Sequence, residues 1–574
     1  MLKFNRSLFV ALFLAGLTQA KEIKITLLAT TDLHGNLLPY DYYTAQPADR
    51  GLAKIASLIR SARAESPNNL LIDCGDTIQG TPLESLYQHY IETGHLPLKL
   101  TFAGPPLDHD PMMLAMNAIG YDAMVVGNHE FNFGLKNLSQ ARAQARFPWI
   151  SANIRVERRA TQRPFAAYFV KMIAGVKFAV IGVTTPMVPE WESPEHYSGY
   201  RFEPGVEAVR AALTELKDRV RPDIIIVASH SGLDRDPQTG AVRPDYSREN
   251  FAYQIAAEVK GIDAVIFGHT HQQLAEYKVG DVSLMQPKNW GISLGRMDFV
   301  LEPARGGTFK VLSKSSRLIP VTAGTPADAK VIEVARPYHE LAENYLKTPV
   351  AQAAVDLDAR LARVQDTALL DAIQQAQLFY SKADVSFASS FNPRVAVSKG
   401  SVTVRQIAAL YSYDNQLYAL EGNGKMVREA LENAARYFLR CPGDCSQGPL
   451  INSQVVGFNY DMAAGVEYEI DVSRPVGERI RNLRRNGKPL SDDEPLRLAV
   501  NNYRAAGGAG YSMFRGAKVV WRSTEEIRDM VVSYYIEKKQ LPVKPDDNWR
   551  IIPEAARKVL VQEALAEAQG VILK

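Results

Sequence analysis

The stretch IKITLLATTDLHGN, residues 23–36, joins a run of apolar and β-branched residues to a loop that carries Asp32 and His34. A run of this kind, ending in small and polar residues, predicts a buried strand. The same pattern returns four times, in LLIDCGDT (70–77), AMVVGNHEF (123–131), IIIVASHSG (224–232) and AVIFGHTH (264–271). Because parallel strands deliver the loops at their carboxyl ends to one edge of a sheet, we expect these loops to meet.

The loops contain seven candidate metal ligands, which are Asp32, His34, Asp76, Asn128, His230, His269 and His271. The chain has 10 His, and five of them fall in these loops, whereas chance placement would scatter them. A lone His at a strand end is usually structural. The combination of Asp-x-His, Gly-Asn-His-Glu and Gly-His-x-His favours a metal centre instead. Carboxylate, amide and imidazole ligands suit Zn²⁺, Mn²⁺, Co²⁺ or Fe²⁺ and do not select among them.

Asp76 is the best candidate for a carboxylate that bridges two metal ions. Gly75 before it allows a sharp turn of the backbone, and an anion between two cations offsets their repulsion. Two divalent ions roughly 3.5 to 4 Å apart can activate a hydroxide for in-line attack and hold the phosphoryl oxygens in the same step. The sequence therefore predicts phosphoester hydrolysis.

The length of 574 residues, with 46% hydrophobic residues, predicts a globular protein of two or three domains. Apolar runs alternate with amphipathic stretches to about Arg317, which predicts an α/β sandwich with buried sheets over 21–325. Residues 204–220 have helical spacing. We expect a linker helix over 326–348, interrupted at Pro337, and a mixed α+β domain over 349–574.

The first 20 residues have the pattern of a secretory signal peptide, with Lys3 and Arg6, an apolar run over 8–17 and small residues before Lys21. The alternative is a membrane anchor, but ten apolar residues are too few to span a bilayer core of about 30 Å. Cleavage would leave basic and acidic residues nearly balanced, since the whole chain has 66 and 63 of them. We therefore expect an exported protein without stable membrane association and without a nucleic-acid polymer as partner.

The chain has three Cys. In an oxidising compartment, Cys441 and Cys445 could close a small loop, although the sequence leaves their pairing open. Cys74 would then remain free. A free Cys beside a strand end is more often a packing residue than a ligand.

The whole set of motifs resembles the calcineurin-like metallophosphoesterases, and within them the secreted nucleotidase family with an appended C-terminal domain. The resemblance implies a four-layered α/β/β/α catalytic domain, a linker helix and a C-terminal α+β domain that selects the nucleotide. It implies that Asp32, His34, Asp76 and His271 hold one metal. It implies that Asp76, Asn128, His230 and His269 hold the other. His129 matches the family's catalytic histidine, which stabilises transition-state oxygens or protonates the leaving group.

Three departures from the 5'-nucleotidase pattern are informative. Asn132 stands where that pattern has Asp, His271 where it has Gln, and Ala509 where it has the Asp of Gly-Gly-Asp-Gly. An Asp would favour an imidazolium at His129, whereas a neutral Asn132 can only orient the ring. The stretch GNHEFNFG, together with DTIQGTPL, resembles instead the periplasmic 2',3'-cyclic-nucleotide 2'-phosphodiesterase/3'-nucleotidase branch.

Candidate substrate-binding residues lie in the C-terminal domain. Arg394 could pair with a phosphate or a sugar. The resemblance implies that Tyr413 and Tyr503 stack on the base and that Asn415 contacts its edge; each Tyr could otherwise be an ordinary half-buried packing residue.

The leading hypothesis is a periplasmic enzyme, expected to be a monomer, that opens 2',3'-cyclic nucleotides to 3'-nucleotides and then releases nucleoside and phosphate. Two alternatives stay open. One is a 5'-nucleotidase or nucleotide-sugar hydrolase of the same fold, and the other is a nucleotide-binding protein that has lost catalysis. The loaded metal, the base preference and the balance of the two activities are not determined by the sequence.

Overall fold

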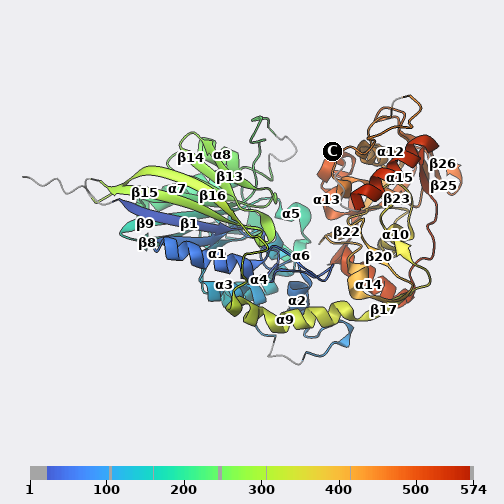
Figure 1. Ribbon diagram of the computed structural model, residues 1–574. Helices are drawn as coiled ribbons and strands as arrows, with labels where there is room; N and C mark the ends of the chain where they lie inside the picture. Colours follow the sequence, from blue (N-terminus) through green and yellow to red (C-terminus); the bar gives the residue numbers. More distant parts are fainter. Residues whose placement is uncertain are drawn as a thin grey trace, which may run out of the picture.

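The computed structural model describes residues 22–568, apart from 103–106, 160, 243–247, 305–306, 414 and 442. The expected signal peptide, residues 1–20, lies outside the described residues. Two domains stand side by side, and one long helix runs beneath both (Figure 1). Within the described residues, no helix combines the length and apolar character needed to cross a membrane.

The first sheet of the N-terminal domain has the strand order β16-β15-β1-β4-β5-β6. Its strands β1, β4, β5 and β6 are parallel, so their carboxyl ends lie at one edge. Strand β1 is buried on both faces, which explains why its sequence is almost continuously apolar. The bounds are β1 Ile23–Thr30, β4 Asn69–Asp73, β5 Ala123–Val125, β6 Trp149–Ile150, β15 Ser293–Pro303 and β16 Phe309–Pro320.

The second sheet has the order β13-β14-β12-β11-β9-β8. Strands β9, β11, β12 and β14 are parallel, and the outer strands β13 and β8 are antiparallel to their neighbours. The bounds are β8 Tyr168–Ile173, β9 Val176–Thr184, β11 Ile224–His230, β12 Ala264–Phe267, β13 Leu274–Val279 and β14 Val282–Gln286.

The two sheets pack face to face and helices cover their outer faces. Leu27 faces the core between the sheets, and Leu28, on the opposite face of the same strand, packs beneath the helices of the first sheet. The predicted four-layered α/β/β/α sandwich is therefore confirmed. Its helices are α1 Leu52–Glu65, α2 Pro82–Thr93, α3 Pro111–Ile119 and α4 Gly134–Gln144 on the first sheet, with α7 Gly205–Arg219 and α8 Ala252–Glu258 on the second.

Helix α9 (Ala329–Lys347) joins the domains and corrects one expectation. We expected an interruption at Pro337, but the helix continues through it. Pro337 removes one backbone N–H, at a cost of about 3 kcal/mol in a helix interior. The buried stripe of Val331, Ala335, Tyr338, Leu341, Ala342 and Leu346 along the helix offsets that cost by packing.

The C-terminal domain is the expected α+β unit. A five-stranded sheet of order β23-β19-β27-β22-β28 and a four-stranded sheet of order β26-β25-β24-β29 are covered by helices. The strands are β19 Val385–Ser389, β22 Gln416–Asn423, β23 Asp461–Ala464, β24 Glu467–Asp471, β25 Ile480–Arg485, β26 Lys488–Pro489, β27 Pro495–Asn501, β28 Val519–Glu526 and β29 Trp549–Ile552. The helices are α10 Ala368–Ser381, α12 Gly424–Ala434, α14 Ile527–Lys538 and α15 Glu554–Ala568.

Shorter elements connect these layers. The strands are β2 Tyr40–Asp41, β3 Gln46–Pro47, β7 Ile154–Val156, β10 Tyr200–Phe202, β17 Pro349–Ala353, β18 Leu357–Asp358, β20 Ala396–Val397 and β21 Gly400–Thr403. The helices are α5 Val188–Trp191, α6 Pro194–Tyr197, α11 Val404–Ala408 and α13 Asn502–Ala505. Cys441 and Cys445 form a disulfide, and Cys74 is buried in the core between the sheets.

Candidate metal centre

Six of the candidate ligands follow strands β1, β4, β5 and β12, and His230 is the last residue of β11. The ligands from both sheets meet at one edge of the sandwich. Five of them have a backbone in the left-handed region, with positive φ at Asp32, His34, Asp76, His269 and His271. Non-glycine residues rarely adopt this conformation, which costs of order 1 to 3 kcal/mol each and is concentrated at functional sites. The fold therefore holds these side chains in place at the expense of local backbone strain.

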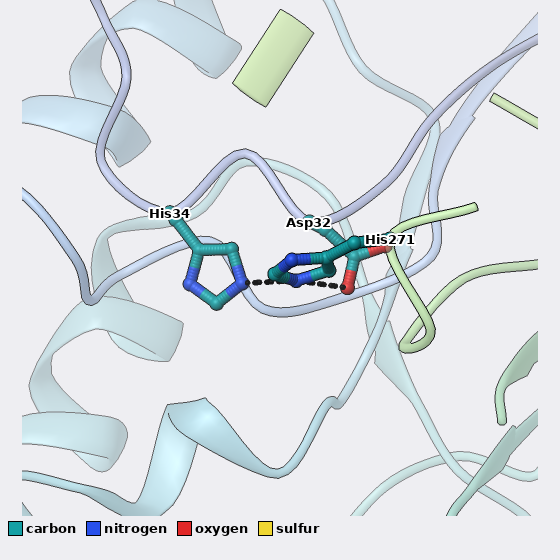
Figure 2. Close-up of side chains that lie close together, drawn as sticks. All are labelled: Asp32, His34 and His271. Carbon is teal, nitrogen blue, oxygen red and sulfur yellow. Dashed lines mark hydrogen bonds and ion pairs between the residues drawn. The ribbon is translucent and has the colours of Figure 1, made fainter. Parts of the chain in front are cut away.

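Asp32, His34 and His271 form the first group (Figure 2). His34 Nε2 lies 3.0 Å from His271 Nε2, and His271 Nε2 lies 3.6 Å from Asp32 Oδ1. On its other side, His34 Nδ1 lies 3.0 Å from Gln79 Oε1, which fixes the ring. Two ring nitrogens and a carboxylate oxygen thus converge on one point.

Asp76, His230 and His269 form the second group. Asp76 Oδ2 lies 2.8 Å from His230 Nε2 and 3.9 Å from His34 Nε2, so this carboxylate stands between the two groups. Asn128 Oδ1 lies 3.2 Å from His230 Nε2. Asp76 has the position that a bridging carboxylate requires, and Asn128 adds an amide oxygen to the second group.

The protonation of His34 and His271 suits metal ligands, whereas His230 holds a proton beside Asp76 that a bound cation would displace. Burial lowers the pKa of His34 to about 4 and that of His271 to about 3, so both rings are neutral at pH 7 with a lone pair to donate. Burial also disfavours protonation of His230, but the charge of Asp76 outweighs it and raises the pKa to about 10. A carboxylate among imidazoles, without thiolate, fits two divalent ions of the Zn²⁺, Mn²⁺, Co²⁺ or Fe²⁺ class.

Two glycines allow the loops to approach closely. A Cβ at Gly127 would lie 2.2 Å from Asp76 Oδ1, and one at Gly268 would lie 1.9 Å from Thr31 Oγ1. Neither position has room for a side chain, which gives a physical reason for the glycine in GNHEF and in GHTH.

Glu130 organises the Asp76 loop, and our sequence analysis did not single it out. Its buried carboxylate accepts the backbone N–H groups of Asp76, Gly127 and Thr77 at 2.9, 2.6 and 2.6 Å. These bonds hold the loops after β4 and β5 together beside the ligands. The available signal was its place in the same GNHEF motif, directly after His129.

His129 begins a short 3₁₀ helix (His129–Phe131) directly after the ligand Asn128. Its backbone N–H donates to Asp76 Oδ1 at 2.8 Å, and its ring packs edge-on against His34 with centroids 5.1 Å apart. Its Nδ1 lies 2.6 Å from Asn132 Oδ1. The predicted catalytic pair therefore lies beside both ligand groups and is hydrogen-bonded internally.

Glu249 and Trp191 also border the second group, and no motif pointed to either. Glu249 Oε1 lies 2.8 Å from His269 Nε2. The Trp191 ring stacks on His269 with centroids 5.5 Å apart and an interplanar angle of 26°. Trp191 thus covers one side of the candidate metal centre.

Of the predicted substrate-binding residues, Tyr413 lies in an aromatic group with two residues that the sequence analysis missed. Its ring centroid is 5.1 Å from that of Phe391 and 5.6 Å from that of Phe458. Tyr413 remains 41% exposed, so much of the ring is open to a ligand. Arg394 follows Phe391 closely in the sequence and is exposed. Together with Arg363 it lines a separate open pocket of about 360 Å³.

Asn415 lies where the C-terminal domain contacts Trp191, at the border of the candidate metal centre. The Asn415 amide donates to Asn502 Oδ1 at 3.2 Å, and Asn502 Nδ2 donates to the Trp191 carbonyl at 3.4 Å. Tyr418 Oη donates to the same carbonyl at 3.0 Å. Tyr503 follows Asn502 in helix α13 and is 39% exposed. These contacts connect the candidate base-binding loops to His269 through Trp191.

Comparison with known proteins agrees with this geometry. Residues 25–273 match the calcineurin-like phosphoesterase family, and residues 349–516 match the 5'-nucleotidase C-terminal domain. The chain is 30% identical to the 2',3'-cyclic-nucleotide 2'-phosphodiesterase/3'-nucleotidase of Salmonella typhimurium, over 96% of this chain and 92% of that protein.

It is also 29% identical to the trifunctional nucleotide phosphoesterase YfkN of Bacillus subtilis, over 95% of this chain but only 40% of that longer protein. Among solved structures, a Staphylococcus aureus protein assigned as a 5'-nucleotidase superposes with a TM-score of 0.75 and 27% identity, over 92% of this chain and 100% of that one. The chain therefore belongs to the 5'-nucleotidase family, with a calcineurin-like metallophosphoesterase domain at its N-terminal end.

Proposed function

We propose that this metal-dependent nucleotidase hydrolyses 2',3'-cyclic nucleotides to 3'-nucleotides and then 3'-nucleotides to nucleosides and phosphate. The observation that carries the hydrolytic part is the position of Asp76 between two groups of converging ligands. Members of the calcineurin-like family hold two metal ions, and the donor set here fits such a pair.

Asp32, His34, Asp76 and His271 would hold one ion, and Asp76, Asn128, His230 and His269 the other. When bound, the pair supplies an activated hydroxide and neutralises charge on the phosphoryl oxygens. His129 lies beside both groups and would donate a hydrogen bond or a proton to the oxygen that leaves. Trp191 and the C-terminal domain would exclude water from one side of the site.

The choice of substrate is supported by three residues and by one relative. Asn132, His271 and Ala509 depart from the 5'-nucleotidase pattern, and the Salmonella relative is named for the cyclic and 3' activities. In the structure, Ala509 presents its backbone carbonyl to Asn433 Nδ2 at 3.2 Å and has no side-chain acceptor for a ribose hydroxyl. Tyr413 and Tyr503 would stack on the base, with Asn415 at its edge and Arg394 at a phosphate or sugar.

A substrate panel tests the proposal. The purified protein, loaded with Mn²⁺ or Co²⁺, is assayed with 2',3'-cAMP, 3'-AMP and 5'-AMP, and products are separated by chromatography. We expect 3'-AMP to accumulate transiently from the cyclic substrate and adenosine to follow. Turnover of 5'-AMP alone would instead assign the chain to the 5'-nucleotidases. Absence of any turnover, together with tight nucleotide binding, would indicate a binding protein.

We also propose that the enzyme works in the periplasm as a monomer, with nucleotides as its partners. The pattern of residues 1–20 supports export. Mass spectrometry of the protein from a periplasmic extract should find Lys21 at the N-terminus. An intact Met1 in the membrane fraction would contradict cleavage.

A further inference from the structure

Glu192 is a buried carboxylate beside the proposed catalytic pair, His129 and Asn132, and no sequence motif indicated it. It follows helix α5 and its side chain is 3% exposed. Its Oε1 accepts the Asn132 Nδ2–H at 2.5 Å, and its Oε2 accepts the His196 Nδ1–H at 3.1 Å. A chain of four side chains therefore runs from His129 through Asn132 and Glu192 to His196.

The chemistry of the Asn132 amide gives this chain a direction. An amide has one oxygen that accepts and one nitrogen that donates. Because an ionised carboxylate can only accept, the nitrogen of Asn132 must face Glu192 and its oxygen must face His129. The His129 nitrogen next to that oxygen, Nδ1, must then carry a proton. Glu192 thereby assigns the Nδ1 proton of His129 to this chain, and the ring can donate to the leaving oxygen from Nε2 when both of its nitrogens carry a proton.

We propose that Glu192 is a positioning residue for His129, which acts through Asn132 to fix the ring orientation and to keep the proton on Nδ1. This inference rests on the role of His129 in the proposed function. In the 5'-nucleotidase pattern an Asp at position 132 would contact the histidine directly. Here Glu192 supplies the carboxylate, which is separated from His129 by the side chain of Asn132.

The surroundings of Glu192 keep it in place. The preceding residue, Trp191, is fixed by its stacking on His269 and by the hydrogen bonds that its carbonyl accepts from Tyr418 and Asn502. Glu192 N–H donates to the Val188 carbonyl at 2.9 Å. A carboxylate held on both sides can define the orientation of the Asn132 amide, because that amide has no freedom to rotate without losing both hydrogen bonds.

The first experiment compares Glu192→Gln with Glu195→Gln, a matched control at an exposed Glu three residues away. A Gln at 192 can present either an acceptor or a donor, so it no longer dictates the orientation of Asn132. We expect a kcat reduced on the order of ten- to hundredfold, with KM within about twofold and metal content unchanged. The Glu195→Gln protein should match the parent protein. An unchanged kcat in Glu192→Gln, or loss of both metals, would overturn the proposal.

The second experiment restores a carboxylate one position closer. In the Glu192→Gln background, Asn132→Asp should recover most of kcat, because the new carboxylate contacts His129 directly and a Gln can donate to it. Alone, Asn132→Asp should lower kcat, since two carboxylates would then face each other. A purely structural role for Glu192 predicts instead that the two losses simply add.

A third comparison uses His129→Ala as background, where Glu192→Gln should have no further effect on kcat, because its target is gone. A further tenfold loss of kcat in that background would show that Glu192 does not act through His129. All variants are assayed with bis(p-nitrophenyl) phosphate as well as with nucleotides. If the parent protein hydrolyses neither cyclic nor 3'-nucleotides, the proposed substrate is refuted. The nitrophenyl assay still tests whether Glu192 acts through His129.

Discussion

The metal centre and the aromatic patch of the C-terminal domain, formed by Phe391, Tyr413 and Phe458, are built in opposite ways. Five of the seven candidate ligands are buried, and five adopt strained backbone conformations at or after strand ends. The patch consists of two loop residues and of Phe458 in a short 3₁₀ helix (Gly457–Asn459), and Tyr413 is 41% exposed. Chemistry that must be precise requires a rigid edge, whereas the base recognition proposed for the patch tolerates adaptable side chains.

The largest effect should follow from removing the catalytic imidazole. We expect His129→Ala to lower kcat by about 10² to 10⁴ while the metals remain, since general acid catalysis is lost but no ligand is removed. Steady-state kinetics and elemental analysis of the same preparation measure both quantities. Loss of both metals would assign His129 to the ligand shell.

A smaller effect should follow from weakening the support of the Asp76 loop. Glu130→Gln keeps the shape but replaces one acceptor oxygen by a donor, which then faces a backbone N–H. We expect metal affinity to fall by roughly 10 to 100-fold, as for other residues that orient ligands. Titration of the metal-free protein with Mn²⁺ would show it, and an unchanged affinity would mean that the strand ends alone hold Asp76.

The aromatic patch should respond in KM. Tyr413→Ala removes one stacking face, worth about 1 to 3 kcal/mol when fully used, and the partial exposure of the ring places the effect at the lower end. We expect KM to rise roughly five- to tenfold at nearly constant kcat. Tyr413→Phe serves as the control and should retain the parent KM. If the Ala variant has the same KM as the parent protein for nucleotides of every base, Tyr413 does not contact the base.

The smallest expected effect is on the stability of the C-terminal domain and involves no residue of the metal centre. Asp366, Asp371 and Asp546 cluster near α10, where burial and the neighbouring carboxylates raise the pKa of Asp371 to about 8 and that of Asp366 to about 6. The folded state then binds more protons than the unfolded chain between about pH 4 and 8. Stability should therefore decrease as pH rises through this range.

Asp371→Asn removes that ionisation while keeping an oxygen for the Asp546 N–H. Thermal unfolding at pH 5, 6.5 and 8 should show a smaller loss of midpoint temperature in the variant than in the parent protein. Parallel loss in both proteins would show that Asp371 is ionised throughout.

The strands and ligands could be predicted where local pattern and chemistry agree. Strands β1, β11 and β12 have almost continuous apolar runs because both faces are buried, and each ends at a candidate ligand or two residues before one. The interruption predicted at Pro337 is wrong, because packing along the buried stripe of α9 outweighs the helix-breaking tendency of one residue. Glu130 and Glu192 were not predicted, because a hydrogen bond to a distant backbone or side chain leaves no periodic signal in the sequence.

By itself, the sequence determined the class of fold and the type of chemistry, because strand periodicity and the identity of ligand side chains are local properties. Only the tertiary structure decided how the pieces are coupled. Asp76 stands between two ligand groups, Trp191 connects His269 to the C-terminal domain, and Glu192 restores a carboxylate behind Asn132. Each of these depends on residues that are far apart in the chain and become neighbours only when two sheets and two domains pack together.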